Sequence, residues 1–486
     1  MAIRIRSSEN PEMDRTFRGH WHTRDQPDPI PGSLTFSQEN GILLDLSGSL
    51  LGQDQTQFGP KQVLGRAFDG TFLTIDRGHY EGQIAPWFED QSRAAPIVAA
   101  EEWGGWALIV GAQLPQGGRT TIRQLRFRSP MLRAWTTWHR PKYTRLYEEG
   151  VAGGQIELKS PVTAQISGGT IDFNWHIMES GSQFSSDIRF VPEFHVKFDE
   201  DIKIDDAWTK IVIPLLQFLT FCVGAGDSAE GVVMNQSMEE DPTSHTMAQD
   251  SHGGPLWGGW FEWCSTSWMA RPGSQKAPHE AQLVCRAPQD DAEFARLLSK
   301  WFESYDHLKP ALFDFLSINM WAQMTIEESF YRAVRSLEVV HGILNPAPHI
   351  PREDFKRIKQ KIKLAVEGEP YGEFVRNRLS HADAPTLRER LEDLVENAGP
   401  RLRNRLRFDD VIPKVVRARN ELTHAGALES SAEEELHELF HLMIMLMNTT
   451  LLRELGYDPL DTEDQLWHTP NALAVDPTRR LPMGDD

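Results

Sequence analysis

The spacing of hydrophobic residues changes once along the chain, near residue 290. Before that point apolar and polar positions alternate in short stretches, as in Ile171–Ile177 and Phe194–Phe198. A period of two residues is typical of β-strands with one buried face. Asn40 and Gly41 stand between two apolar runs, and this dipeptide favours the tight turn of a hairpin. The first 290 residues therefore predict an antiparallel β-rich domain, folded as a sandwich or a distorted barrel.

Three segments of this region carry more specific predictions. The stretch with Ile122, Leu125 and Phe127 is interrupted by arginines and predicts an exposed strand. Asp205 or Asp206 is expected to cap a helix that runs to about Cys222, before the glycines at 224 and 226. Residues 238–254 are polar and lack periodicity, which predicts a mobile loop.

From residue 291 onward, apolar residues recur every three to four positions, which is the period of amphipathic helices. Each expected helix has a start signal or a capping residue near its N-terminus: Asp291, Thr325, Pro351, Thr386, Asp410 and Ser431. In the helix that Pro351 opens, the inward stripe is expected to be Phe355, Ile358, Ile362 and Ala365. The pattern predicts an all-α bundle that ends before a loosely ordered tail.

The predicted fold class is thus α+β multidomain, an N-terminal antiparallel β-rich domain followed by a C-terminal all-α bundle. We place the first domain at residues 1–290, the bundle at 291–465 and the tail at 466–486. A length of 486 residues is too great for one ordinary core and fits two or three domains.

The cysteines and the N-terminus predict a cytoplasmic location and no contact with membranes. The three cysteines, Cys222, Cys264 and Cys285, lack metal-type spacing and form no even disulfide set. The first six residues lack the apolar core of a secretion signal. The most apolar run, residues 211–223, is too short to span a bilayer and indicates a buried helix.

Charge is distributed unevenly. The net charge of −20 argues against nonspecific binding of polyanions by the whole surface. Residues 352–419, however, hold 17 Lys and Arg against 12 Asp and Glu. This excess of five positive charges has two open interpretations. It is either a set of solvated helix faces or a basic platform for a nucleic-acid backbone.

The residues 419–424, Arg-Asn-Glu-Leu-Thr-His, are the strongest candidate for chemistry. A guanidinium presents a planar fork of donors to phosphate oxygens, and an imidazole exchanges protons near neutral pH. Together they would suffice to cleave RNA without metal, with His424 activating a ribose 2′-hydroxyl and Arg419 stabilising charge on phosphorus. With 17 His and 50 Lys plus Arg, however, roughly one R-x4-H match is expected by chance.

A second R-x4-H match, Arg376 to His381, must be weighed against the first. Arg419 shares an apolar helix stripe with Val415 and Val416, whereas His381 lies in or beside a turn. We therefore take Arg419, Asn420 and His424 as the catalytic candidates. The alternative is that Arg419 only forms a salt bridge with Glu421 or a neighbouring helix. Three further cations are candidates for contacts with the substrate: Arg376, Arg417 and Lys414.

A competing motif follows on the last long helix. His437, Glu438 and His441 match H-E-x-x-H, the pattern of zinc peptidases. The third ligand is missing from the pattern, with Glu454 and Glu463 as unsupported candidates, and the helix continues as bundle core. We therefore expect no metal and no cofactor. His20 and His22 flank Trp21 and receive no role, because isolated histidines in a β-domain are more often ordinary sheet residues.

The motif resembles a known family. A helical bundle with R-N-x-x-x-H at the end of its penultimate helix is similar to the HEPN superfamily of metal-independent ribonucleases. The segments 330–338 (FYRAVRSLE) and 387–391 (LRERL) resemble the same family. The segments 17–22 (FRGHWH) and 31–34 (PGSL) resemble the N-terminal domain of ApeA-type bacterial anti-phage proteins. The resemblance thus covers both ends of the chain.

The resemblance implies a function and partners. It implies that Arg419 and His424 are the catalytic pair, and that Asn420 fills the polar position after the arginine. It further implies an endoribonuclease of abortive infection that cleaves RNA, with tRNA among the expected targets, as a homodimer that answers a phage-derived trigger. The β-rich domain would sense or regulate. The alternatives are a non-catalytic RNA-binding module with a HEPN fold and, less favoured, the H-E-x-x-H zinc peptidase.

Overall fold

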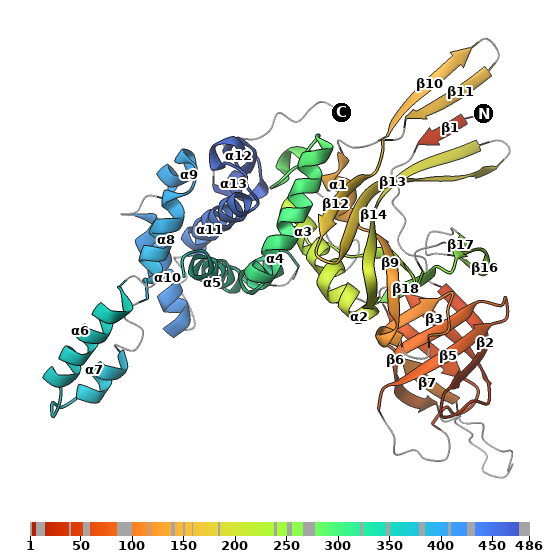
Figure 1. The fold of residues 1–486 in the computed structure, drawn as a ribbon, viewed down its shortest axis with the longest axis horizontal. Helices are drawn as coiled ribbons and strands as arrows, with labels where there is room; N and C mark the ends of the chain where they lie inside the picture. Colours follow the sequence, from red (N-terminus) through yellow and green to blue (C-terminus); the bar gives the residue numbers. More distant parts are fainter. Residues whose placement is uncertain are drawn as a thin grey trace. The chain divides into compact units, whose positions relative to one another are not determined.

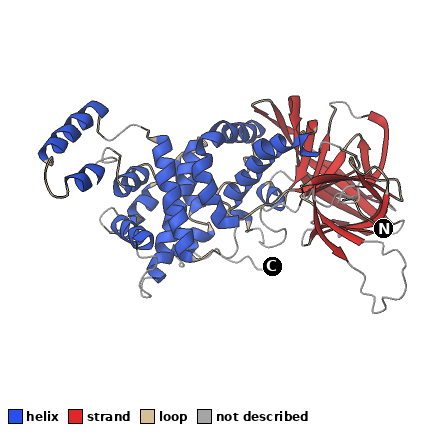
Figure 2. Ribbon diagram, turned by 90° about the horizontal axis from the view of Figure 1, so that it is seen from below, coloured by secondary structure: helices blue, strands red, loops and turns tan. Residues whose placement is uncertain are grey.

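The computed structural model describes most of the chain. The described residues are 2–5, 15–37, 40–51, 59–84, 100–114, 117–137, 141–148, 151–157, 159–182, 185–237, 241–249, 255–265, 278–320, 324–346, 350–378, 384–406, 410–424 and 433–475. The chain divides into two compact units. Unit 1 comprises residues 1–280 and 286–303, and unit 2 comprises residues 281–285 and 304–486. Figures 1 and 2 show that the strands belong to unit 1 and that unit 2 is helical.

The first half of unit 1 is a closed barrel of antiparallel strands. Its strands are β2 (Arg15–Thr23), β3 (Ile30–Ser37), β4 (Gly41–Leu46), β5 (Lys61–Ala67), β6 (Phe72–Ile84) and β7 (Ala100–Gly104). The barrel closes because β7 pairs with both β4 and β6. Trp21, Leu44 and Trp103 are among the large side chains that fill its interior. Gly41, with a positive φ of 79°, begins β4 as the predicted hairpin requires.

The sheet continues from β6 into the second half of unit 1. The further strands are β1 (Ala2–Ile5), β8 (Ala107–Val110), β9 (Thr121–Arg128), β12 (Val162–Ile166), β13 (Gly169–Ser182), β14 (Ser185–Lys203), β15 (Glu230–Asn235) and β18 (Phe261–Ser265). Two pairs stand apart from this sheet: β10 (Lys142–Glu148) with β11 (Val151–Glu157), and β16 (Asp241–Gln249) with β17 (Pro255–Gly258). The predicted antiparallel β-rich domain is therefore confirmed, with a barrel as its first half.

Helices pack against this part of unit 1. They are α1 (Pro130–Trp135), α2 (Ile204–Ala207), α3 (Ile213–Val223) and the first half of α4 (Asp291–Met320). The rings of Trp135 and Phe173 both contact Phe294 of α4, with centroids 4.9 and 5.0 Å away. Trp301 donates its indole N–H to the carbonyl oxygen of Pro214 at 2.9 Å. Among the described residues, one helical stretch, 204–223, is apolar and long enough to cross a membrane. Of its 18-residue window, 78% is buried within the protein, as in the core helix that the sequence predicts.

Three of the finer predictions for unit 1 are wrong. The segment with Ile122, Leu125 and Phe127 is a strand, but all three side chains are buried, because its arginines find partners: Arg126 lies over Trp260, and Arg128 pairs with Glu193. The helix after β14 begins at Ile204, and its N-cap is Lys203, so the aspartates lie in the first turn. The expected loop at 238–254 contains the strand β16.

Unit 2 is an all-α bundle built around one long apolar helix, α11 (Glu433–Glu454). Its other helices are the second half of α4, α5 (Ile326–Leu344), α6 (Arg352–Ala365), α7 (Gly372–Arg378), α8 (Leu387–Glu396), α9 (Pro400–Arg405), α10 (Val411–His424), α12 (Pro459–Leu466) and α13 (Pro470–Val475). The helix α11 contacts α5, α8, α10, α12 and α13. The side chains from Leu442 to Leu446 are therefore buried by the same chain, and α11 presents no spare apolar face there.

Two predictions for unit 2 need correction. The helix α6 packs on α7 (Figure 1), and Ile358 of its expected inward stripe is 41% exposed. The expected loose tail contains α13, whose Ala472 and Val475 are buried and which packs on α11. Short helices with few apolar residues escape detection by periodicity, because their burial depends on a long-range partner.

Candidate active site

The helix α10 carries the candidate residues and is held by its apolar face. Ile412 and Val415 are fully buried, and the helix contacts α5, α8 and α11. Arg419 follows Val415 by four residues, so both side chains leave α10 on nearly the same side. The expectation that Arg419 points toward a packed helix is confirmed. This placement explains why the arginine is half buried.

Arg419 is anchored to Glu338 of α5. Its Nη2 donates to both carboxylate oxygens of Glu338, at 3.1 and 3.4 Å. Its Nη1 makes only a long contact of 3.4 Å with Oδ1 of Asn420. Its Nε is buried and has no hydrogen-bond partner among the described residues. The guanidinium is thus fixed at one corner, while its remaining donors are weakly used or unused.

Glu338 is the site residue that the sequence reasoning missed as a partner for Arg419. It lies in segment 330–338, which carries the family resemblance, but that segment gave it no role. Arg390 of α8 donates to the backbone carbonyl of the same residue at 3.0 Å. The salt bridge to a neighbouring helix that we considered as an alternative therefore exists. It positions Arg419, and it also lowers the free positive charge of the site.

Asn420 and His424 follow on the same helix. Asn420 is exposed, and His424 is the last residue of α10; the side chain of His424 lies outside the described part of the structure. Five residues on an α-helix turn through about 500°, so the Cα atoms of Arg419 and His424 stand about 140° apart around the axis of α10. Within one chain, Arg419 therefore faces α5, whereas the Cα atom of His424 lies on a different side of α10.

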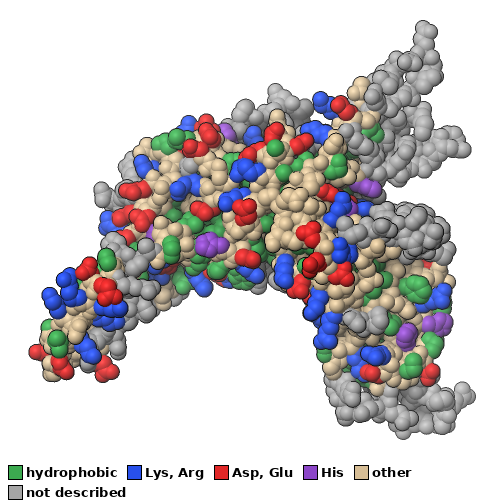
Figure 3. Space-filling model, viewed as in Figure 1, with side chains coloured by type: hydrophobic (Ala, Val, Ile, Leu, Met, Phe, Trp, Pro, Cys, Tyr) green, Lys and Arg blue, Asp and Glu red, His purple; other side chains and the backbone are tan. Residues whose placement is uncertain are grey.

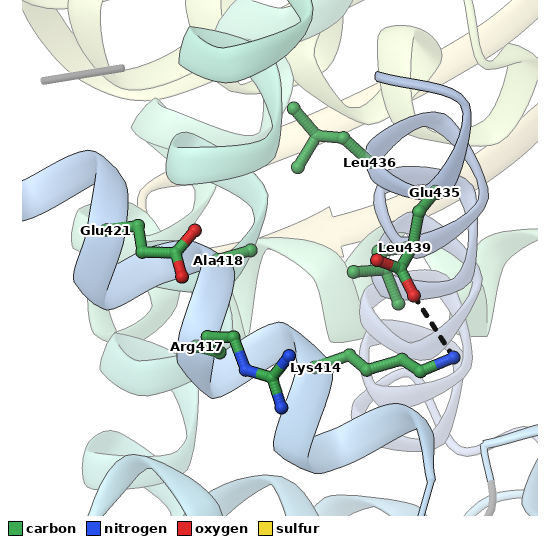
Figure 4. Close-up of a pocket in the computed structure, with 7 residues that line it drawn as sticks. All are labelled: Lys414, Arg417, Ala418, Glu421, Glu435, Leu436 and Leu439. Carbon is green, nitrogen blue, oxygen red and sulfur yellow. Dashed lines mark ion pairs between the residues drawn. The ribbon is translucent and has the colours of Figure 1, made fainter. Parts of the chain in front are cut away.

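Lys414 and Arg417 line a shallow pocket of about 40 Å³ between α10 and α11 (Figure 4). Lys414 is held by two carboxylates, Asp410 at 3.2 Å and Glu435 at 3.1 Å. Hydrogen bonds to Glu435 and then to Asp410 raise the pKa of Lys414. Its charge is therefore already compensated, whereas Arg417 is exposed and reaches toward the pocket. Of Lys414 and Arg417, two of the three predicted substrate contacts, Arg417 is the better placed for a phosphate.

The first R-x4-H match lies elsewhere in unit 2. Arg376 belongs to α7, which packs on α6, and its side chain lies outside the described part, as does His381 altogether. Lys and Arg side chains gather on α6 in Figure 3. They include Lys356, Lys359 and Lys363, and α6 also places acidic residues beside its cations, with Lys356 paired to Glu353 at 2.9 Å. A role of Arg376 in substrate binding stays a prediction.

The H-E-x-x-H residues are engaged in ordinary packing. Glu438 accepts from Arg405 at 3.0 Å, and Nδ1 of His441 is 2.9 Å from Oδ1 of Asn471. Burial lowers the pKa of His441, and nearby His437 acts in the same direction. Glu463, one suggested third ligand, accepts from the backbone N–H groups of residues 401 and 402. In the part that the structure describes, no three His, Cys, Asp or Glu side chains could hold one metal ion.

Two regions of the chain match known family models. Residues 16–241 match the model described as ApeA N-terminal domain 1, and residues 325–459 match the model described as Apea-like HEPN. No curated protein and no solved structure shows significant similarity to the chain.

The second match covers most of the helical unit that holds Arg419, and it defines the class. The protein carries a HEPN domain, a family associated with ribonuclease-type or nucleotide-related functions in defence. Taken with the first match, the chain belongs to the ApeA-type proteins with a C-terminal HEPN domain. The resemblance predicted from both ends of the sequence is thereby confirmed.

Proposed function

We propose that the protein is a metal-independent endoribonuclease of anti-phage defence that cleaves RNA with Arg419 and His424. The observation that carries the proposal is the state of Arg419. It is half buried, fixed by Glu338, and keeps donors that no strong partner occupies. A guanidinium held at one corner is prepared to receive a phosphate oxygen on another.

The reaction would need only these side chains and the RNA itself. His424 would remove the proton of a ribose 2′-hydroxyl, and the 2′-oxygen would attack the adjacent phosphorus. The bond to the 5′-oxygen of the next nucleotide would break and that oxygen would take a proton from water, leaving a 2′,3′-cyclic phosphate and a 5′-hydroxyl, while His424 would return its proton to the solvent. A phosphate oxygen would displace Oδ1 of Asn420 from Nη1, whose contact of 3.4 Å is long for a hydrogen bond. Arg419 would then stabilise the charge that develops on phosphorus.

The proposal includes a homodimer, RNA as substrate and a phage-derived trigger acting in the cytoplasm. The apolar side chains of α11 from Leu442 to Leu446 give no support to the dimer, because they are buried within the chain itself. The dimer is supported by the angle of about 140° between Arg419 and His424 around the axis of α10. Because the two residues of one chain lie on different sides of the helix, a second copy would be needed to place an arginine and a histidine together in one cleft. Transfer RNA is the substrate class that the family resemblance favours.

The second candidate function is a non-catalytic RNA-binding module. One observation favours it, namely that Glu338 already compensates the charge of Arg419. A carboxylate beside the phosphate would weaken RNA binding and would oppose the charge that cleavage places on phosphorus. A purified wild type that retains RNA without cutting it, with and without an infected-cell extract as the source of trigger, would favour this function.

Cleavage of total tRNA by purified protein tests the proposal. The wild type is expected to cut in the presence of EDTA. His424→Ala and Arg419→Ala should lose activity by roughly 10²-fold or more. The matched control is His437→Ala, an exposed histidine of α11 whose loss should leave the rate unchanged. Wild-type rates from His424→Ala, or inhibition by EDTA together with loss of activity in His437→Ala, would overturn the proposal.

A further inference from the structure

The outer face of the barrel in unit 1 carries a row of three side chains from three strands. His20 of β2 lies opposite Arg66 of β5, and Arg66 lies opposite Phe72 of β6. Residues directly opposite in antiparallel strands share one face, with Cβ atoms roughly 5 Å apart. All three are exposed, while Trp21 and Leu73, their neighbours in sequence, are buried. The row is therefore set by the backbone pairing.

Two solvent-exposed aromatic rings, those of Phe72 and Phe68, lie beside Arg66 and His20. The guanidinium carbon of Arg66 lies 5.3 Å from the centroid of the Phe72 ring. Phe68, at the turn after β5, meets the ring of His20 edge to face with centroids 5.4 Å apart. Phe68 is 70% exposed and Phe72 is 42% exposed. Large aromatic faces left in water beside a charge are typical of binding surfaces.

These residues line an open pocket of about 650 Å³. Its remaining lining is His22, Pro27, Pro29, Ala67, Gly70 and Gln113. The prolines come from the turn between β2 and β3, where Thr23 and Gln26 exchange hydrogen bonds of 3.1 Å. Gln113 is anchored by its donation to the carbonyl oxygen of Gly65 at 3.0 Å. Hydrogen bonds within the protein thus fix two parts of the pocket wall, the turn between β2 and β3 and the side chain of Gln113.

The pocket is cationic in a strongly acidic protein. None of its ten lining residues carries a carboxylate, although the chain has a net charge of −20. Two acids near it in sequence are engaged: Asp69 accepts from the backbone N–H of Thr71, and Asp25 lies 3.7 Å from Lys61. Arg66 makes no ion pair with any residue that the structure describes. Asp28, between Pro27 and Pro29, is exposed but is not among the lining residues, so an anion would meet a guanidinium and two imidazoles on the walls of the pocket itself.

We propose that this pocket binds a nucleotide unit, with its phosphate on Arg66, His20 and His22 and its base against Phe68 and Phe72. The guanidinium fork fits phosphate oxygens, and imidazole N–H groups donate to them. The exposed rings offer a planar base the stacking that an inorganic anion could not use. The ligand is either a free mononucleotide or one nucleotide of a single-stranded RNA. The site is independent of Arg419 and His424.

Calorimetric titration of the full chain tests the proposal. The His424→Ala chain is used so that RNA stays intact, and the probes are AMP and a 5′-phosphorylated RNA hexamer, with adenosine and inorganic phosphate as partial ligands. AMP is expected to bind more tightly than either partial ligand. Arg66→Ala should weaken this binding roughly tenfold or more, and Phe68→Ala roughly fivefold or more.

Two variants outside the pocket serve as matched controls. Arg119→Ala removes another exposed arginine of unit 1, and Leu43→Ala removes an apolar side chain that is 40% exposed on β4. Both should leave AMP binding unchanged, and thermal unfolding should show that all four variants are folded.

The outcomes separate the two sources of the nucleotide. If AMP binds and Arg66→Ala weakens it, the ligand is a free nucleotide. If only the hexamer binds, and Arg66→Ala and Phe68→Ala both weaken it, the ligand is a strand. The proposal is overturned if neither probe binds, or if binding is equal in the pocket variants and in the controls. Neither of these results would bear on RNA cleavage by the wild type.

Discussion

Two arginines, Arg419 in the bundle and Arg66 in the barrel, are placed by the fold in opposite ways. Arg419 emerges from an apolar helix face and is held by the carboxylate of Glu338. Arg66 emerges from the outer face of a sheet and stacks on Phe72, with no carboxylate among the residues lining its pocket. In the first arrangement the carboxylate fixes the position of the guanidinium but also compensates its positive charge. The second leaves the charge available but holds it with less directional contacts.

The largest expected effect is on the rate of RNA cleavage, and two substitutions of Arg419 distinguish the role of its charge from that of its planar geometry. Arg419→Ala should lower RNA cleavage by roughly 10²-fold or more, because the developing charge on phosphorus loses its partner. Arg419→Lys keeps the charge but loses the planar fork and should recover only part of that rate. The measurement is the single-turnover cleavage rate at saturating protein. Equal rates for the wild type and Arg419→Lys would show that cleavage does not need the planar fork of Arg419.

The next effect concerns the packing of Trp21 against Gly65 inside the barrel, beneath the exposed row of His20, Arg66 and Phe72. A Cβ at Gly65 would overlap the ring of buried Trp21, which lies opposite it on β2. Gly65→Ala should therefore destabilise the protein by about 1–3 kcal/mol, the usual cost of overpacking a filled core. Chemical denaturation followed by tryptophan fluorescence measures this cost. Gly59→Ala is the control, because a Cβ there meets nothing within 4 Å. Equal stability of the two variants would contradict the packing described for Trp21.

A smaller effect tests whether the carboxylate of Glu338 limits the free charge of Arg419. Glu338→Gln keeps an acceptor for Nη2 but removes the negative charge, so it makes Arg419 more like Arg66. RNA should then bind several-fold more tightly, because phosphate no longer competes with a carboxylate. The loss in stability should be about 1 kcal/mol or less, as for a partly exposed ion pair. Fluorescence anisotropy with labelled RNA checks this, and weaker binding by the variant would contradict it.

A further prediction concerns a buried carboxylate, Asp227, that forms no ion pair with any residue that the structure describes. Asp227 accepts from the hydroxyl of Ser129 at 2.5 Å and from the backbone N–H of Met131 at 3.3 Å. Burial raises the pKa of Asp227 to about 7, although these hydrogen bonds act against the shift. The folded state then holds a proton that the unfolded chain releases near pH 4, so stability should fall as the pH rises from about 4 to about 7.

Asp227→Asn should flatten this dependence, because the amide does not titrate. Melting temperatures of the wild type and the variant across this pH range measure it. A parallel decline in both proteins would assign the pH dependence to other groups.

The sequence predicted the parts of these sites that depend on local spacing. The hairpin at Gly41, the burial of Val415 and the position of Arg419 on a packed helix face all follow from periodicity and turn chemistry. Glu338 was not assigned as the partner of Arg419, because which helices meet is decided by packing across 81 residues of sequence.

The sequence could not predict the row of His20, Arg66 and Phe72 for a related reason. Strand order and register decide which residues stand opposite one another, and a shift of one residue would have placed each side chain on the other face. His20 and His22 thus received no role from the sequence, although the structure places both in the pocket.

The chemical form of the RNA ends tests the central claim most directly. Wild-type protein, incubated with tRNA in EDTA, is expected to leave 2′,3′-cyclic phosphate and 5′-hydroxyl ends, resolved by mass spectrometry of the fragments. An RNA with a 2′-O-methyl group at the cleaved nucleotide should resist, because His424 would have no hydroxyl to activate. Fragments with 3′-hydroxyl and 5′-phosphate ends, or equal cleavage of the methylated RNA, would contradict the account.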